Sequence, residues 1–191
     1  MIKLIKQSIG RRILTKTKEF LHASLLVGAL VALLASPSQV LGQAAVPSDP
    51  FVILLKGIYQ PVVKAPNLGL SQVDLNDASY STVNIYPVSG LPGNRNDDKP
   101  IGNFYVQFGG MLCAYKVPGG AMAMEFTGSD YVIELDGEGG FYVIGTFELT
   151  IEEGTGIYKS FVGGHNHMVD VLHFLADGNR EEYCFCNITR P

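Results

Sequence analysis

Residues 121–126 and 141–150 read AMAMEF and FYVIGTFELT, and their alternation indicates the fold. On a strand, Met122, Met124 and Phe126 share one face, while Ala121, Ala123 and Glu125 share the other, because successive side chains point to opposite sides. The second stretch alternates in the same way. Neither segment shows the spacing of an amphipathic helix, so both are predicted as β-strands.

The same pattern continues on both sides of these stretches, with apolar or alternating runs broken by Gly, Pro, Asn and Asp. Residues 60–80 and 90–100 are rich in these turn formers and are expected to be loops. Bends are expected at Gly109-Gly110 and at Thr127-Gly128-Ser129, where glycine permits a kink. The predicted strands are Phe51–Gln60, Ser81–Val88, Ile101–Val117, Ala121–Leu135, Phe141–Thr150, Gly156–Tyr158, Phe161–Leu175 and Glu181–Thr189.

About eight strands joined mainly by short turns predict an all-β domain that forms a small closed antiparallel up-and-down β-barrel, because closure removes exposed sheet edges. A β-sandwich is the alternative fold. Since both faces of the strands are partly apolar, a homo-oligomer is also expected.

The first 44 residues have a different character from the rest. They carry six Lys or Arg and one acidic residue, and the 13-residue apolar run Ala23–Ala35 is followed by the small residues of LGQAA at 41–45. This is the anatomy of a signal peptide, with cleavage expected between residues 42 and 45 and a mature domain at 45–191. The run is too short for a stable membrane span. A secreted or periplasmic protein is predicted, and Arg11-Arg12 leave a twin-arginine route open beside general secretion.

Beyond residue 44 the chain carries 8 basic and 17 acidic residues. Such an acidic surface argues against nucleic acid as a partner, because phosphate backbones attract Lys and Arg. The cysteines Cys113, Cys184 and Cys186 all lie in this part. In an exported protein they are disulfide candidates, most simply Cys113 with Cys184 or Cys186. The alternative is a metal-binding C-x-C, which lacks further ligands at suitable spacing in the sequence.

The late segment IEEGTGIY at 151–158, followed by Gly163, resembles the turn of the allene oxide cyclase and dirigent-like β-barrel superfamily. GGMLCAYKVPGG at 109–120 and FYVIGTFELT also fall where that superfamily has strands. The resemblance implies a barrel that binds a small apolar metabolite and guides its cyclisation or stereoselective coupling, with no redox cofactor. Two positions depart from it: Phe51–Gln60 contains no carboxylate, and Val162 stands where dirigent proteins place an arginine.

These departures favour an alternative function, a non-catalytic lipocalin-like ligand carrier or cell-envelope protein. For catalysis, the candidates are His165, His167, Glu125 and Glu148, since imidazole and buried carboxyl groups exchange protons near neutral pH. His165 and His167 lie about 6.6 Å apart along one face of a strand, which makes them a weak candidate metal pair. Glu152, Glu153, Glu181 and Glu182 are interpreted as surface charge at turns or strand ends. Asn187 begins a formal glycosylation acceptor, Asn-Ile-Thr.

Overall fold

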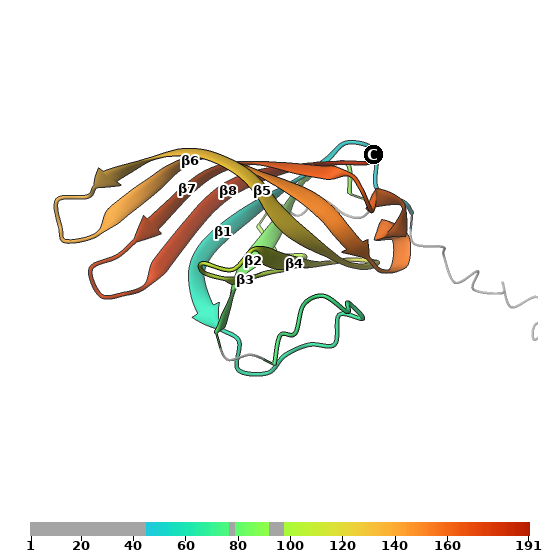
Figure 1. Ribbon diagram of the computed structural model, residues 1–191, viewed down its shortest axis with the longest axis horizontal. Coiled ribbons are helices and arrows are strands. Elements are labelled where there is room, and N and C mark those ends of the chain that lie inside the picture. The colour runs from blue at the N-terminus through green and yellow to red at the C-terminus, as the bar shows by residue number, and fades with distance from the viewer. Residues whose placement is uncertain (1–44, 77–78, 92–97) are drawn as a thin grey trace, which may run out of the picture. The chain divides into compact units, whose positions relative to one another are not determined.

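The computed structural model describes residues 45–76, 79–91 and 98–191, in which eight antiparallel strands form a closed barrel (Figure 1). The predicted signal peptide at 1–44 lies outside the described residues. The strands are β1 (Phe51–Pro61), β2 (Tyr80–Ser89), β3 (Gly102–Gln107), β4 (Leu112–Val117), β5 (Gly120–Leu135), β6 (Phe141–Gly154), β7 (His165–Phe174) and β8 (Arg180–Thr189), with one 3₁₀ helix, η1 (Gly156–Phe161).

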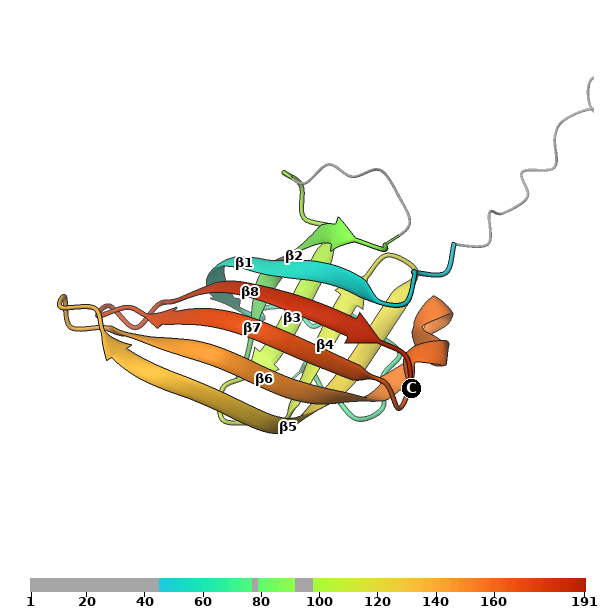
Figure 2. The same cartoon turned by 90° about the horizontal axis from the view of Figure 1, so that it is seen from above.

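Each strand pairs with the next one along the chain, and β8 returns to pair with β1 over Phe51 to Ile58. This order makes an up-and-down barrel without free edges, and it confirms the predicted fold class over the sandwich. Figures 1 and 2 show the β5–β6 and β7–β8 hairpins projecting at one end. The described part of the chain contains no helix with the length and apolar character needed to span a bilayer.

Alternation sorts the side chains of β5 as expected. Met122 and Met124 are fully buried inside the barrel with the main core cluster. Ala121 and Ala123 on the opposite face are buried as well, because Leu68, Val73 and Leu75 of the irregular segment 62–76 pack on them from outside. The small alanine side chains let this segment approach the sheet closely.

The expected strand Gly156–Tyr158 is wrong, because this segment forms the helix η1. Gly156 has a φ of +58°, and a Cβ there would lie 1.9 Å from the carbonyl oxygen of Gly119, so only glycine fits this turn. The turn directs Tyr158 and Phe161 inward, where both pack against Phe51 with ring centroids 6.0 and 5.3 Å away. These three rings fill the barrel at the end where β1 begins.

Other boundaries also differ from the prediction, whereas one predicted bend is confirmed. Ile101–Val117 forms two strands, β3 and β4, because Gly109, with a φ of +87°, allows a turn between them. β7 begins at His165 rather than Phe161, since η1 takes the preceding residues. The bend predicted at Thr127-Gly128-Ser129 is present as a register shift between Phe126 and Gly128 within a continuous β5.

Candidate functional site

A cavity of about 710 Å³ occupies the barrel end opposite η1. It lies between the β3–β4 turn and the inner faces of the projecting hairpins. Its walls are mainly apolar, and its aromatic lining includes Phe108, Phe126, Phe141, Phe147 and Phe174. Such a volume and lining are typical of a site for a small organic molecule.

Arg180 stands beside this cavity. Its Cζ lies 4.2 Å from the ring centroid of Phe108 and 5.4 Å from that of Phe174. Both rings line the cavity, so the guanidinium covers part of its aromatic wall through cation–π contacts.

Two carboxyl groups, Asp170 and Glu182, are the charged groups among the residues that line the cavity. They come from the adjacent strands β7 and β8, and only 4% and 3% of their surfaces are exposed. Glu182 Oε2 accepts a hydrogen bond of 2.6 Å from the Tyr59 hydroxyl. Asp170 Oδ1 is buried without a hydrogen-bond partner. The cavity therefore combines apolar walls with a small group of buried polar atoms.

Burial shifts the proton affinities of these groups. Desolvation raises the pKa of Asp170 to about 7. The pKa of Glu182 is raised well above its ordinary value, first by burial and then by the nearby charge of Asp170. Burial, followed by the charge of Glu182, also raises the pKa of Tyr59. Near neutral pH this group of side chains holds protons that exposed carboxyl groups would have lost.

Cys184 lies beside the two carboxyl groups. One donor atom each from Asp170, Glu182 and Cys184 fall within 4.8 Å of one another, so these three residues could hold a metal ion. Burial raises the pKa of the Cys184 thiol well above its ordinary value, so a metal would have to displace its proton.

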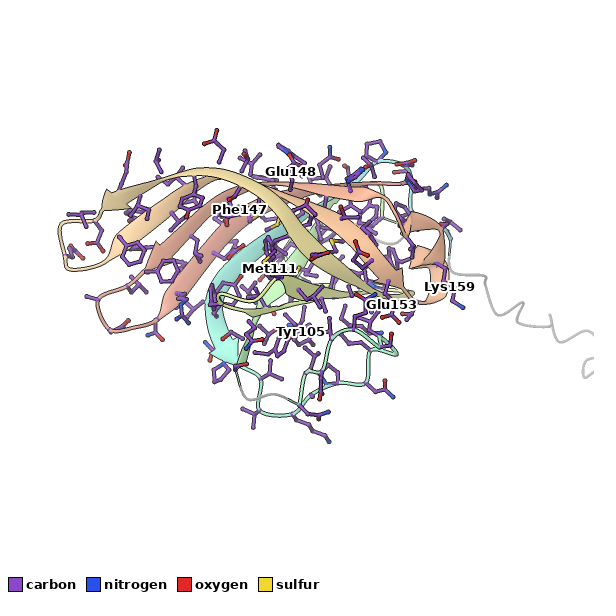
Figure 3. The ribbon with its side chains drawn as sticks, viewed as in Figure 1. Tyr105, Met111, Phe147, Glu148, Glu153 and Lys159 are labelled. Carbon is purple, nitrogen blue, oxygen red and sulfur yellow. The ribbon has the colours of Figure 1, made fainter. Side chains whose placement is uncertain are left out.

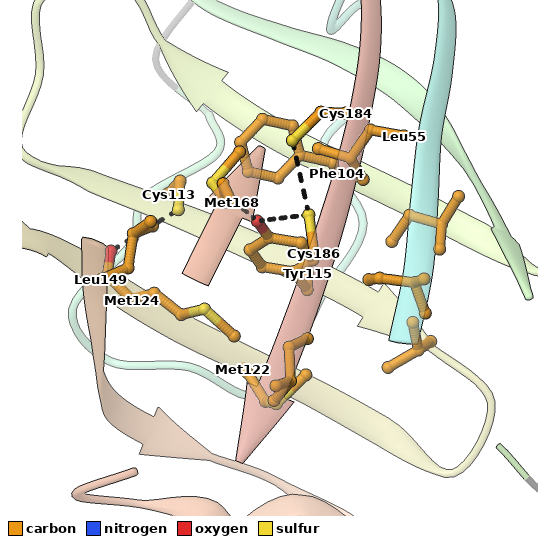
Figure 4. Close-up of a cluster of buried hydrophobic side chains, with 14 of the residues drawn as sticks. Leu55, Phe104, Cys113, Tyr115, Met122, Met124, Leu149, Met168, Cys184 and Cys186 are labelled. Carbon is orange, nitrogen blue, oxygen red and sulfur yellow. Dashed lines mark hydrogen bonds between the residues drawn. The ribbon is translucent and has the colours of Figure 1, made fainter. Parts of the chain in front are cut away.

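The expected disulfide is absent, since all three cysteines are free. Cys113 lies on β4, and its thiol donates to the carbonyl oxygen of Met124. Cys184 and Cys186 point into the barrel from β8, with Sγ atoms 3.8 Å apart and unbonded (Figure 4). Strand geometry explains the absence of a bond within this pair, because residues two apart point the same way and bridge each other poorly.

A buried tyrosine network lies deeper in the barrel. The Tyr115 hydroxyl is 3.7 Å from Cys186 Sγ and 3.7 Å from Met168 Sδ (Figure 4), and it accepts a hydrogen bond of 3.0 Å from Asn166 Nδ2. Tyr115, Cys186 and Asn166 are fully buried. These contacts form a packed layer beneath the cavity.

The candidate residues from the sequence do not line the cavity. His165 and His167 share one face of β7, as predicted, but that face is the exposed outer one. His167 pairs there with Glu148 through its Nδ1 atom, and Figure 3 labels Glu148 beside the inward-facing Phe147. Glu125 lies on the outer face with Ala121 and Ala123. Asn187, the glycosylation candidate, is exposed on the outer face of β8.

Sequence reasoning missed Asp170 and Glu182. Glu182 was expected at the surface because it lies near a strand end, yet it is among the most buried polar residues described. A signal was present: Asp170 shares its strand face with Met168, and Glu182 shares its face with Cys184, Cys186 and Ile188. A carboxylate in register with such residues can lie on an inner face.

No family model matches the chain. Neither the curated proteins nor the solved structures contain a match.

Proposed function

We propose that the barrel binds a small, largely apolar metabolite in the 710 Å³ cavity and guides its cyclisation or stereoselective coupling without a redox cofactor. The observation that carries the proposal is the aromatic lining combined with a few buried polar atoms. Phenylalanine side chains favour an apolar ligand, while the Tyr59, Asp170 and Glu182 groups give it one preferred orientation.

The mechanism is geometric. A reactive intermediate that is held in one conformation, away from water, follows the pathway which that conformation favours, because the entropy cost of orientation is met on binding. Cyclisation by this route is an isomerisation, and coupling is the addition of one ligand molecule to another, so atoms and electrons balance within the ligands and no oxidant is needed. The side chains that line the cavity determine which parts of the ligand come together and react.

Ligand binding is tested with the neutral fluorescent probe N-phenyl-1-naphthylamine on the full-length chain. Leu172 lines the cavity and Val171, its neighbour on β7, points outward with 38% of its surface exposed. Leu172→Trp should weaken probe binding about tenfold or more by filling the cavity, whereas Val171→Trp should leave it unchanged. Absence of probe binding to the wild type, or equal binding by both variants, would contradict the proposal.

A second candidate function is a non-catalytic carrier of the same class of ligand. It is favoured by the position of His165, His167, Glu125 and Glu148, none of which lines the cavity.

The two functions differ in the fate of the ligand. We would incubate the protein with an apolar extract of the organism that makes it, using Leu172→Trp as the control, and compare the products by chromatography and mass spectrometry. A new isomer of unchanged mass indicates cyclisation, a new product with the combined composition of two precursors indicates coupling, and retention of an unaltered compound indicates a carrier.

A further inference from the structure

Three side chains with metal-ligating atoms converge beneath the cavity. Asp170, Glu182 and Cys184 each offer one atom, and these atoms lie within 4.8 Å of one another. Strand register produces this convergence: Asp170 of β7 is directly opposite Cys184 of β8, and Glu182 precedes Cys184 by two residues on the same inward face. The three residues are 4%, 3% and 0% exposed.

Among the described residues, no salt bridge joins these atoms to a basic side chain. Asp170 Oδ1 is buried with no hydrogen-bond donor, and a second carboxyl group lies beside it. Arg180 is two residues from Glu182 on β8, but its guanidinium lies over the rings of Phe108 and Phe174. Placing two carboxyl groups together away from water is costly unless a cation or shared proton compensates. A bound cation would satisfy the orphaned oxygen and offset this cost.

We propose that Asp170, Glu182 and Cys184 bind a divalent transition-metal ion, and that zinc fits the set best. Zinc accepts both carboxylate oxygen and thiolate sulfur, whereas magnesium and calcium are held by oxygen ligands. In a tetrahedral zinc site with bonds of about 2.0–2.3 Å, neighbouring ligand atoms are roughly 3.3–3.8 Å apart. Atoms that already lie within 4.8 Å need to approach by at most about 1.0–1.5 Å.

The site would have three protein ligands and one open position. Asp170 and Glu182 also line the cavity, so the fourth position is accessible to a molecule bound there. Three protein ligands with an open position are typical of zinc sites that act on a bound molecule. The Tyr59 hydroxyl would support the site from outside, because its hydrogen bond to Glu182 Oε2 holds that carboxyl group in place. Metal binding goes beyond the proposed function and does not depend on it, so zinc binding and probe binding can fail separately.

Cobalt(II) provides a spectroscopic test on the reduced full-length chain. Cobalt bound to a thiolate gives a sulfur-to-metal charge-transfer band in the near ultraviolet, which surface histidines do not produce. The band should appear in the wild type and disappear in Cys184→Ser. It should remain in Cys113→Ser, because Cys113 lies on β4 with its thiol on the Met124 carbonyl oxygen. A missing wild-type band, or a band that survives in Cys184→Ser, overturns the proposal.

Zinc titration by calorimetry tests the carboxylate ligands. Asp170→Asn should weaken zinc binding at least tenfold, whereas Asp130→Asn, the same charge change at an exposed position on β5, should not. The metal-free Asp170→Asn variant should unfold at a temperature equal to or above that of the wild type, since it buries no charge. Equal zinc affinity in both variants overturns the proposal. So does a lower unfolding temperature in metal-free Asp170→Asn that accounts for its weaker binding.

Discussion

The Tyr59 hydroxyl, near the end of β1, donates a hydrogen bond of 2.6 Å to Glu182 Oε2 on the neighbouring strand β8. The two residues are 123 positions apart in sequence. Both side chains are buried, with 7% of Tyr59 and 3% of Glu182 exposed. This bond links a cavity-lining carboxyl group on β8 to β1, the strand that pairs with β8 to close the barrel.

Tyr59→Phe is therefore expected to lower the free energy of unfolding by about 1–3 kcal/mol, because it leaves a buried carboxyl oxygen without its donor. Urea unfolding measures the change. Tyr183→Phe is the matched control, since Tyr183 is 46% exposed on the outer face of β8 and its loss should change stability by less than about 0.5 kcal/mol. Equal effects of the two variants would show that the bond to Glu182 contributes nothing particular.

Glu153 anchors the irregular segment 62–76 to the barrel. Its carboxylate accepts hydrogen bonds from the backbone N–H groups of Ser71 and Gln72, at 2.7 and 3.2 Å, and from the Ser71 hydroxyl. Desolvation alone would raise the pKa of this carboxyl group, but the hydrogen bonds outweigh it and the pKa is lowered. The ionised form is thus the one that holds the segment.

Because the folded pKa is depressed, the anchoring is present at neutral pH and is lost as the pH falls below 4.5, the ordinary value. Glu153→Gln should speed amide hydrogen exchange in residues 68–75 at pH 7. Lowering the pH should loosen the segment in the wild type, after correction for intrinsic exchange, and have less effect in the variant. Glu152→Gln, the same change one residue earlier, should resemble the wild type at both pH values. A variant with wild-type exchange at pH 7 would rule out this role.

The strands and the sorting of β5 were predictable from alternation, and the short turns between the strands favoured a barrel over a sandwich. The inward face of β7 was not, since HNHMVDVLHF carries apolar side chains on both faces: Met168 and Leu172 on one, Val169 and Val171 on the other. Pairing with β6 and β8 selects the face with Asp170. The sequence alone does not show which face points inward, so the sequence analysis named His165 and His167 of the outer face as candidates and missed Asp170 of the inner face.

The prediction of a strand directly after β6 was wrong for a different reason. Ile157 and Tyr158 have high strand propensity, yet Gly156 adopts a left-handed conformation that turns the chain into η1. A tertiary contact decides this point, since the turn lies against the carbonyl oxygen of Gly119. Local propensity carries no information about such a contact.

The N-terminal segment predicts a processing event that can be measured directly. Expressed in a host that exports it, the protein should be recovered outside the cytoplasm with a new N-terminus between Gly42 and Ala45, as read by intact-mass measurement. Leu30→Arg places a charge within the apolar run Ala23–Ala35 and should leave the uncleaved precursor inside the cell. An exported protein that retains residues 1–41, or a variant processed like the wild type, would refute the signal-peptide interpretation.

Alanine substitutions at Gly156 and Gly178 distinguish the effect of backbone strain from that of a steric clash. Both have positive φ, +58° and +87°, so alanine at either position is strained by about 1–2 kcal/mol. At Gly178 an added Cβ meets nothing within 4 Å, whereas at Gly156 it would lie 1.9 Å from the Gly119 carbonyl oxygen. Gly156→Ala should therefore destabilise the protein by at least about 1 kcal/mol more than Gly178→Ala in urea unfolding. Because η1 carries Tyr158 and Phe161 into the barrel, only Gly156→Ala should also speed hydrogen exchange around Phe51; equal losses in both variants would mean that the contact with Gly119 does not hold η1 in place.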